Sequence, residues 1–282
     1  MTDEAPTGPS RPTKERLDAA LVAAGLFATR AQARAAVMAG TVRIDGRKAD
    51  KAGQMVTPSA LLQVDEPALR YVSRGGLKLE KALDTFDLDV TGFLCLDVGA
   101  STGGFTDCLL QHGAREVWAV DVGYGQLAWK LRTDPRVKLL ERTNARNLNP
   151  AELPVFDLVT VDTSFISVTV FLDVLARSLA AGGSVVWLIK PQFEAGPRQV
   201  GKKGVVRDAQ VHVDVLEQTL GRAEGVRLRV CGLTYSPVRG PAGNIEFLAW
   251  LRRAEEGMPP ASDEEMKMIV RRVVAQAHER LK

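Results

Sequence analysis

Short apolar runs that alternate with helical patterns are the feature that most restricts how this sequence can fold. Five such runs follow residue 90, at residues 93–98, 117–122, 137–140, 158–161 and 185–189. Helical patterns lie between or after them, at residues 105–111, 168–179 and 209–222. Runs of this length are typical of strands buried on both faces, and helical connections make successive strands parallel. The alternation predicts an α/β domain with a mostly parallel, doubly wound sheet.

The residues before 65 follow a different order, which is helix, helix and small sheet. A helical pattern over residues 13–24 is followed by a second one that begins at Thr29, where Gln32 completes a capping box. Residues 42–46 alternate apolar and polar side chains into an Asp45-Gly46 hairpin signal, and further strands are expected near 56 and over 61–64. The periodicity lapses between 65 and 74. We therefore expect a small domain over residues 1–65, a linker over 66–74 and a large domain over 75–282.

Basic residues are concentrated in the small domain, although the net charge of the chain is only +3. Between Arg11 and Lys51 there are nine basic and four acidic residues, an excess of five. Arg30 and Arg34 are four residues apart and share a helical face, so they are expected beside the basic residues of the hairpin as a phosphate-binding cluster. A solvated helix surface is the alternative interpretation.

Several classes of protein are disfavoured. No run of eighteen apolar residues occurs, and the polar N-terminus lacks a signal-peptide pattern, so we expect a cytoplasmic protein without membrane contact. The cysteines lack metal or redox spacing and are expected to be reduced and buried; they are Cys95, Cys108 and Cys231. No histidine falls in a catalytic or metal-binding motif, and no metal is expected; the histidines are His112, His212 and His278.

A glycine-rich turn follows the first strand of the large domain, over residues 96–105. A dinucleotide fingerprint would need a glycine where Ser101 stands, and the strand ends on Asp97, an acid that suits the ammonium of an amino-acid ligand. Asp121 closes the second strand and is placed to bind a ribose hydroxyl pair. Asn144 follows the third strand and could form hydrogen bonds with the edge of an adenine. The alternative is that the acids only cap loops.

Four further polar residues are expected at the carboxyl edge of the sheet or on its flanks, where ligands bind in such folds. They are Lys78, Asp162, Lys190 and Glu246. Asp162 and Lys190 each follow an apolar strand directly, so they should lie near the cofactor site.

These four residues match the Lys-Asp-Lys-Glu tetrad of FtsJ-like RNA ribose methyltransferases, and the strings 71–76, 99–105, 121–127, 141–146 and 190–194 resemble the TlyA family. The resemblance covers nearly the whole chain, since residues 16–46 also resemble the αL RNA-binding domain named after a small-subunit ribosomal protein. It implies a Rossmann-like class I methyltransferase domain that transfers a methyl group from S-adenosylmethionine to the 2′-hydroxyl of cytidines in ribosomal RNA. One departure is Thr163, because the family usually has leucine after the motif aspartate.

The resemblance and the residue patterns together assign the sites. The expected cofactor-binding residues are Asp97, Gly99, Ser101, Thr102, Gly103, Gly104, Phe105, Asp121, Val122, Asn144 and Asp162. The expected RNA-binding residues of the small domain are Arg16, Arg30, Arg34, Arg43 and Lys48. A glycine-rich basic loop after Lys190 adds Arg198, Lys202, Lys203 and Arg207, although a mobile surface loop has the same composition.

We expect Lys190 to be the general base that deprotonates the ribose hydroxyl. A lysine has to be neutral for this role, and a nearby cation such as Lys78 would favour the neutral form. Asp162 would orient Lys190, and Glu246 would position Lys78 or the ribose.

A final helix is expected after Ser262, which forms a capping box with Glu265. This helix resembles that of the longer TlyA subtype, which is implied to modify both ribosomal subunits.

Three rival functions remain open: a pore-forming hemolysin, a catalytically idle RNA-binding assembly factor, and a pseudouridine synthase with the same N-terminal module. The first would need an insertion element, the second has no need of the tetrad, and the third has no use for the glycine turn and its acids.

Overall fold

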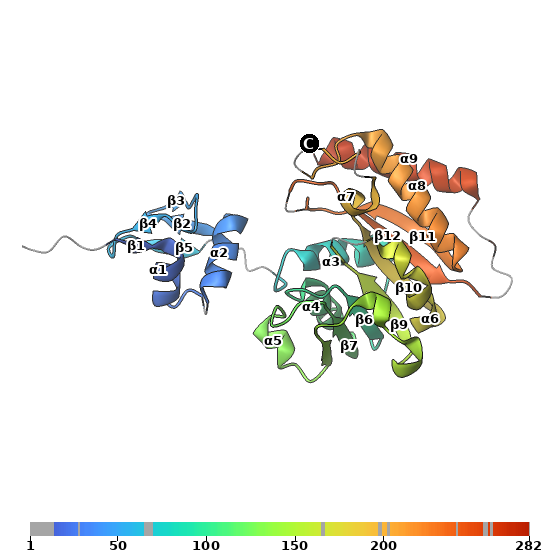
Figure 1. Cartoon of the computed structure of the whole chain (residues 1–282), viewed down its shortest axis with the longest axis horizontal. Coiled ribbons are helices and arrows are strands. Elements are labelled where there is room, and N and C mark those ends of the chain that lie inside the picture. Colours follow the sequence, from blue (N-terminus) through green and yellow to red (C-terminus); the bar gives the residue numbers. More distant parts are fainter. Residues whose placement is uncertain are drawn as a thin grey trace, which may run out of the picture. The chain divides into compact units, whose positions relative to one another are not determined.

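The structure is a computed structural model that describes residues 14–27, 29–64, 70–164, 167–196, 199–201, 204–240, 242–255, 259 and 262–281. The chain divides into two compact units, Met1–Leu69 and Arg70–Lys282. Figure 1 shows the helices and strands of each unit. Each unit has its own hydrophobic core.

The first unit has the expected order of two helices and a small sheet. Helix α1 (Leu17–Ala23) packs against α2 (Arg30–Ala39), and a three-stranded sheet follows in the order β3-β2-β5. Its strands are β2 (Val42–Ile44), β3 (Arg47–Lys48) and β5 (Leu62–Val64), and a separate pair joins β1 (Glu15–Arg16) to β4 (Met55–Val56). Leu17, Leu21 and Val42 are fully buried in its core.

Local sequence signals set the boundaries of α2 and of the hairpin. Thr29 and Gln32 form the expected capping box, and Gly40 ends the helix in the left-handed conformation with φ 74°. Asp45 and Gly46 both have positive φ, 51° and 78°, as a two-residue type I′ hairpin turn requires.

The second unit is built on a seven-stranded sheet in the order β11-β12-β10-β9-β6-β7-β8. Its strands are β6 (Leu94–Val98), β7 (Glu116–Val120), β8 (Val137–Leu140), β9 (Phe156–Val161), β10 (Leu179–Ile189), β11 (Leu228–Tyr235) and β12 (Phe247–Arg253). Strands β6 to β10 are parallel to their neighbours, as expected, whereas β12 runs antiparallel between β10 and β11. The sequence patterns had not indicated β11 and β12.

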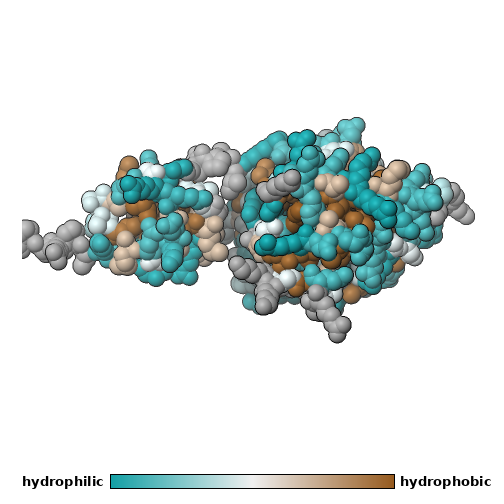
Figure 2. All heavy atoms as spheres, turned by 90° about the horizontal axis from the view of Figure 1, so that it is seen from above, coloured by the Kyte–Doolittle hydropathy of each residue, from teal (hydrophilic) through white to brown (hydrophobic). Residues whose placement is uncertain are grey.

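Helices cover both faces of this sheet (Figure 1). One core contains side chains of α6 (Leu172–Ser178), α8 (Ala209–Gly225) and α9 (Asp263–Arg280), and the other contains those of α3 (Gly75–Phe86), α4 (Gly104–Gln111) and α5 (Trp129–Arg132). The short helix α7 (Pro191–Glu194) follows β10 directly. Figure 2 shows mostly hydrophilic residues on the visible surface of both units, with an apolar area among them on the second.

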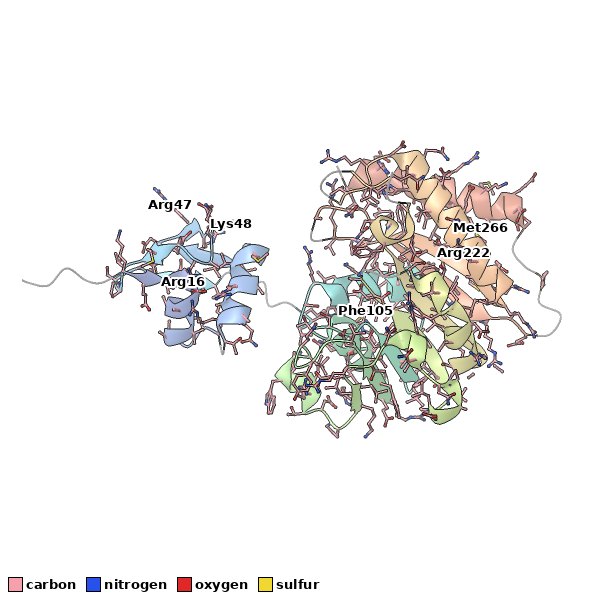
Figure 3. The ribbon with its side chains drawn as sticks, in the orientation of Figure 1. Arg16, Arg47, Lys48, Phe105, Arg222 and Met266 are labelled. Carbon is pink, nitrogen blue, oxygen red and sulfur yellow. The ribbon has the colours of Figure 1, made fainter. Side chains whose placement is uncertain are left out.

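The terminal helix α9 begins at the expected capping box of Ser262 and Glu265. Its apolar stripe, which includes Met266 (labelled in Figure 3) and Val270, is buried against the rest of the second unit.

Two expectations about the fold were wrong. The helix expected over 168–179 is split into a 3-10 turn at Val168–Val170 and α6, and Leu179 already belongs to β10. Cys95 and Cys108 are buried, but Cys231 is exposed because it lies on the edge strand β11. The units divide after Leu69, and Tyr71, which lies within the expected linker 66–74, is buried in the core beside α3 and α4.

Candidate active site

The turn after β6 is shaped by residues with positive φ. Gly99, Ser101 and Gly103 have φ values of 88°, 48° and 99°. A Cβ at Gly99 would lie 2.6 Å from the carbonyl oxygen of Asp162, so only glycine fits where the turns after β6 and β9 meet.

This turn forms one wall of a pocket of about 320 Å³ at the carboxyl edge of the sheet. Six of the expected cofactor-binding residues line it: Gly99, Ser101, Asp121, Val122, Asn144 and Asp162. The Asp121 carboxylate accepts hydrogen bonds from the backbone N–H groups of Ser101 (2.8 Å) and Gly123 (2.6 Å). These two bonds fix the carboxylate at the rim while leaving lone pairs for a ligand.

Asn144 lines the same pocket and caps the short 3-10 turn Ala145–Asn147. Its Oδ1 accepts a hydrogen bond from the backbone of Arg146 at 3.0 Å. The amide nitrogen is then the group that this side chain can donate to a ligand.

Asp97 does not line the pocket, contrary to the direct ligand contact expected of it. The carboxyl group is fully buried and accepts hydrogen bonds from the hydroxyls of Thr106 (2.6 Å) and Thr160 (3.0 Å). Burial raises the pKa of Asp97 to about 6, even though the two hydroxyls oppose this shift. In this structure Asp97 joins α4 to the strands β6 and β9 that carry the pocket.

Three neighbours of the glycine turn also serve packing. Phe105 is buried in the core beside α3 (Figure 3), and Gly103 faces Leu127 and Leu131. A Cβ at Gly104 would lie 2.9 Å from the backbone nitrogen of Gly76, so this glycine lets α4 approach α3 closely. Thr102 is exposed, and its carbonyl accepts a hydrogen bond from Ala128.

Lys190 follows β10 and is nearly buried, with 8% of its surface exposed. Its Nζ lies 2.6 Å from Asp162 Oδ1 and donates a hydrogen bond to Ser164 Oγ at 2.9 Å. The ammonium therefore has two oxygen partners, both from the loop after β9 and both at the pocket wall.

Lys78 and Glu246 form a second, more deeply buried ion pair. Lys78 Nζ donates to Glu246 Oε2 at 2.5 Å, and the two side chains are 7% and 1% exposed. The carboxylate also lies against Gly240, where a Cβ would fall 2.5 Å from Glu246 Oε1. Both lysines of the expected tetrad are thus paired with its acids.

The sheet register places these two pairs side by side. Ile189 of β10 is paired with Phe247 of β12 in an antiparallel register. Lys190 follows Ile189 and Glu246 precedes Phe247, so they are neighbours one step beyond that pair. All four expected catalytic residues therefore meet at one edge of the sheet.

Sequence reasoning missed two residues of this site, Ser164 and Glu194. Glu194 of α7 accepts hydrogen bonds from Ser167 Oγ (2.5 Å) and from the backbone of Val168 (3.1 Å). Lys190 and Glu194 therefore hold the two ends of the loop after β9. The available signal was the position of Glu194 in the family-like string 190–194 and that of Ser164 two residues after Asp162.

The expected RNA-binding residues of the second unit are only partly described. Arg207 is exposed, whereas Arg198, Lys202 and Lys203 lie outside the described residues. The buried Asn244, two residues before Glu246, holds the end of this loop: its Nδ2 donates a hydrogen bond to the Gly204 carbonyl, and its Oδ1 accepts one from the Val206 N–H.

The basic residues of the first unit differ in their contacts. Arg16, Arg30 and Arg34 all contact the buried carboxylate of Asp18. Arg43 and Lys48 are paired across β2 and β3, and the Lys48 side chain lies over Gly40, which ends α2. Arg16, which the expected cluster of Arg30, Arg34, Arg43 and Lys48 did not include, is therefore joined to Arg30 and Arg34 through Asp18.

In the part of the chain that the structure describes, no group of three or more His, Cys, Asp or Glu is placed to hold a metal ion. Among those same residues, no helix has the length and apolar character needed to cross a membrane.

Comparisons with known proteins agree with this geometry. The model of the FtsJ-like methyltransferase family matches residues 71–253, and that of the S4 domain matches residues 15–62. YqxC of Bacillus subtilis, which is named as an rRNA methyltransferase, is 49% identical over 279 residues, covering 95% of this chain and 96% of that protein.

Two further similarities extend over most of the chain. The 16S/23S rRNA (cytidine-2′-O)-methyltransferase TlyA of Mycobacterium tuberculosis is 47% identical over 241 residues, covering 85% of this chain and 90% of that protein. A solved structure of a Streptococcus thermophilus protein named as a hemolysin has a TM-score of 0.75 and 46% identity, covering 96% and 98% of the two chains. The chain therefore belongs to the FtsJ-like methyltransferase family, within its TlyA group, and carries an N-terminal S4 domain.

Proposed function

We propose that this protein transfers the methyl group of S-adenosylmethionine to the 2′-hydroxyl of a cytidine in ribosomal RNA. The observation that carries the proposal is the meeting of the Lys190–Asp162 and Lys78–Glu246 ion pairs beside the pocket. The name of the M. tuberculosis relative supplies the nucleotide and the class of RNA. Since ribosomal RNA is the proposed substrate, we expect the protein to act in the cytoplasm.

The pocket residues fit S-adenosylmethionine. Asp121 presents a fixed carboxylate that suits a ribose diol, and Asn144 offers an amide donor that suits the adenine edge. The glycine turn at Gly99 allows a ligand to approach the backbone closely. When bound, the cofactor supplies an electrophilic methyl group on a sulfonium, and it leaves as the thioether S-adenosylhomocysteine.

Lys190 accepts the proton of the 2′-hydroxyl at Nζ while the oxygen forms its bond to the methyl carbon. Asp162 and Ser164 fix the position of Nζ, so the nitrogen needs little reorganisation before the reaction.

Lys78 has a different role from the free cation expected from the sequence. Its charge is compensated by the Glu246 carboxylate, whose Oε2 lies 2.5 Å from Lys78 Nζ. We assign Lys78 to the positioning of the ribose and Glu246 to the positioning of Lys78.

RNA binding is assigned to both units. The basic residues of the S4 domain and the exposed Arg207 carry positive charge that suits phosphate groups. Those of the S4 domain are Arg16, Arg30, Arg34, Arg43 and Lys48. These contacts would position the substrate without identifying the nucleotide, which the residues around Lys190 would have to select.

The test is to map ribose methylation in ribosomal RNA from cells with and without this protein, by mass spectrometry of nuclease fragments. The proposal expects at least one cytidine whose ribose gains the mass of one CH₂ group only when the protein is present. The subunit that carries the site is read from the same map. Identical maps, combined with no S-adenosylmethionine binding by calorimetry, would contradict the proposal.

A further inference from the structure

Asp18 is a fully buried carboxylate in the RNA-binding unit, and it has three arginine partners. Arg16 donates from Nε (3.1 Å) and Nη2 (3.2 Å), and Arg34 donates from Nε (2.9 Å). Arg30 Nη2 lies 3.0 and 3.1 Å from the two carboxylate oxygens. Hydrogen bonds from these arginines, with Arg16 first, lower the pKa of Asp18 below its usual range although burial opposes this.

The three arginines come from two different parts of the unit. Arg16 extends from β1 just before α1, and its guanidinium lies over Gly53, where a Cβ would approach its Nη1 to 3.0 Å. Arg30 and Arg34 share one face of α2. In Figure 3, Arg47 and Lys48 project from β3 away from Arg16, so the hairpin cations form a separate group.

The arginines remain accessible although Asp18 is not. Their side chains are 48%, 49% and 53% exposed, against 0% for Asp18. A guanidinium has five N–H donors, and no arginine here uses more than two of its nitrogens on Asp18. The group carries three positive charges and one negative charge, so it keeps a net charge of +2 at the surface.

We propose that Asp18 is a positioning residue for RNA binding, because it holds the three guanidiniums of Arg16, Arg30 and Arg34 as a preformed phosphate-binding surface. The inference rests on the proposed function, since that function supplies a folded RNA as the ligand. Arginine loses side-chain entropy when it is fixed on a phosphate. Asp18 fixes the three side chains before RNA arrives, so less entropy is lost on binding.

With this role, substitution of an acid changes the RNA affinity in the direction opposite to the usual one. Removal of an acid from an RNA-binding surface normally strengthens binding, because repulsion of phosphates is removed. Removal of the Asp18 charge should instead weaken binding, because the guanidiniums would repel one another and separate. A second acid of the same unit, the exposed Asp50, has no arginine partner among the described residues and serves as the matched control.

The first experiment compares D18N with D50N in the full-length protein. The probe is 16S and 23S ribosomal RNA purified from a bacterium without a TlyA homologue, and binding is followed by fluorescence anisotropy over a range of salt concentrations. We expect D18N to weaken binding by about tenfold or more, and D50N to leave it unchanged or to strengthen it by up to about threefold. Equal effects of the two substitutions would overturn the proposal.

Steady-state methyl transfer separates positioning from structural damage. With a positioning role, D18N raises the KM for RNA by the same factor and leaves kcat at saturating RNA unchanged. A lower kcat with an unchanged KM would indicate a smaller folded fraction and would count against the proposal. Failure of the wild-type protein to bind or methylate the RNA would instead contradict the proposed function.

A second pair of variants tests the same claim without any substitution at Asp18, in case D18N does not fold. R34K keeps the positive charge but replaces the planar guanidinium by an ammonium. The ammonium cannot donate a hydrogen bond to Asp18, as Arg34 Nε does, and at the same time present further N–H donors to solvent. R177K makes the same change at an exposed arginine of α6 in the second unit, which is paired with Asp173. The proposal expects R34K to weaken RNA binding by about threefold to tenfold and R177K to have no effect. Equal affinities for R34K and R177K would overturn it.

Discussion

Gly99 lies directly against the backbone of Asp162, so the cofactor turn and the catalytic loop are in contact. A Cβ at Gly99 would lie 2.6 Å from the carbonyl oxygen of Asp162 and 3.1 Å from the nitrogen of Thr163. The contact follows from the sheet, where β6 and β9 are parallel neighbours and Val98 is paired with Val161. A shift of either turn is therefore transmitted to the other.

We expect G99A to weaken S-adenosylmethionine binding by at least about tenfold, because the new methyl group would displace the loop that carries Asp162. The positive φ of 88° adds a backbone cost of about 1–2 kcal/mol. Calorimetric titration of the cofactor measures the affinity.

G92A is the matched control, because Gly92 also has a positive φ, 77°, but no neighbour within 4 Å of a Cβ. G92A should lower the free energy of unfolding by a similar amount, because of its positive φ, and should leave the affinity for S-adenosylmethionine unchanged. Equal affinity losses in G92A and G99A would show that the contact with Asp162 is unimportant.

Much of this fold could be predicted because its strands are short, apolar and buried on both faces. β8 was predicted at its observed bounds, and β6 and β9 within two residues. β11 and β12 were missed because β11 is an edge strand with polar and small residues, and because no helix separates it from its antiparallel partner. Local periodicity carries no information about such a pairing.

The candidate site was predicted less evenly. The strand pattern marked Asp162 and Lys190, which follow β9 and β10, whereas Lys78 on α3 and Glu246 before β12 were singled out by the family resemblance. The partners of Asp97 and of Arg30 could not be predicted, because Thr106, Thr160 and Asp18 are unremarkable residues in sequence. Their roles depend on contacts between distant elements.

Asp97 should make the stability of the second unit decrease as the pH rises. Burial raises its pKa from 3.8 to about 6, so the folded state binds a proton more tightly than the unfolded state does. The stabilisation is complete below about pH 4 and is lost as the pH rises through 6, with a size on the order of 2–3 kcal/mol. Urea unfolding of wild type and D97N between pH 4 and 7 should show this decreasing component only in wild type. An identical pH profile for the two proteins would contradict the assignment.

His212 should have the opposite effect in the same pH range. It is fully buried, its Nδ1 lies 2.8 Å from His278 Nε2, and burial, followed by the charge of His278, lowers its pKa to about 4. Asp208 at the start of α8 opposes this shift for both histidines, and Arg239 adds to it for His278. The unfolded state binds protons below about pH 6.5 while the folded state does not, so stability is lost as the pH falls from 6.5 to 4.

Substitution H212Q should reduce this loss at acidic pH, and H112Q is the control because His112 lies on the other side of the sheet, after α4. Urea unfolding over pH 4 to 7 measures both. If H112Q and H212Q changed the profile equally, the buried pair would not be its source.

The Lys78–Glu246 pair should be strongly coupled in stability. Removal of one partner leaves an uncompensated buried charge, so K78M should cost about 3–5 kcal/mol, and E246Q should also destabilise. The double variant should be clearly more stable than the sum of the single losses predicts. The exposed Arg177–Asp173 pair is the control, and its single variants should cost less than about 1 kcal/mol. Simple additivity at Lys78 and Glu246 would show that the two charges do not depend on each other.

The most direct test is single-turnover methyl transfer by Lys190 variants, with saturating S-adenosylmethionine and ribosomal RNA. Lys190 Nζ is held by Asp162 and Ser164 at the wall of the pocket, so K190A should keep cofactor and RNA binding but lose about 10²–10⁴ in rate. K190R should not restore the rate, because a guanidinium stays protonated and cannot accept the hydroxyl proton. K267A, on the exposed face of α9, should react at the wild-type rate. Near wild-type rates in K190A or K190R would contradict the assignment of Lys190 as the base.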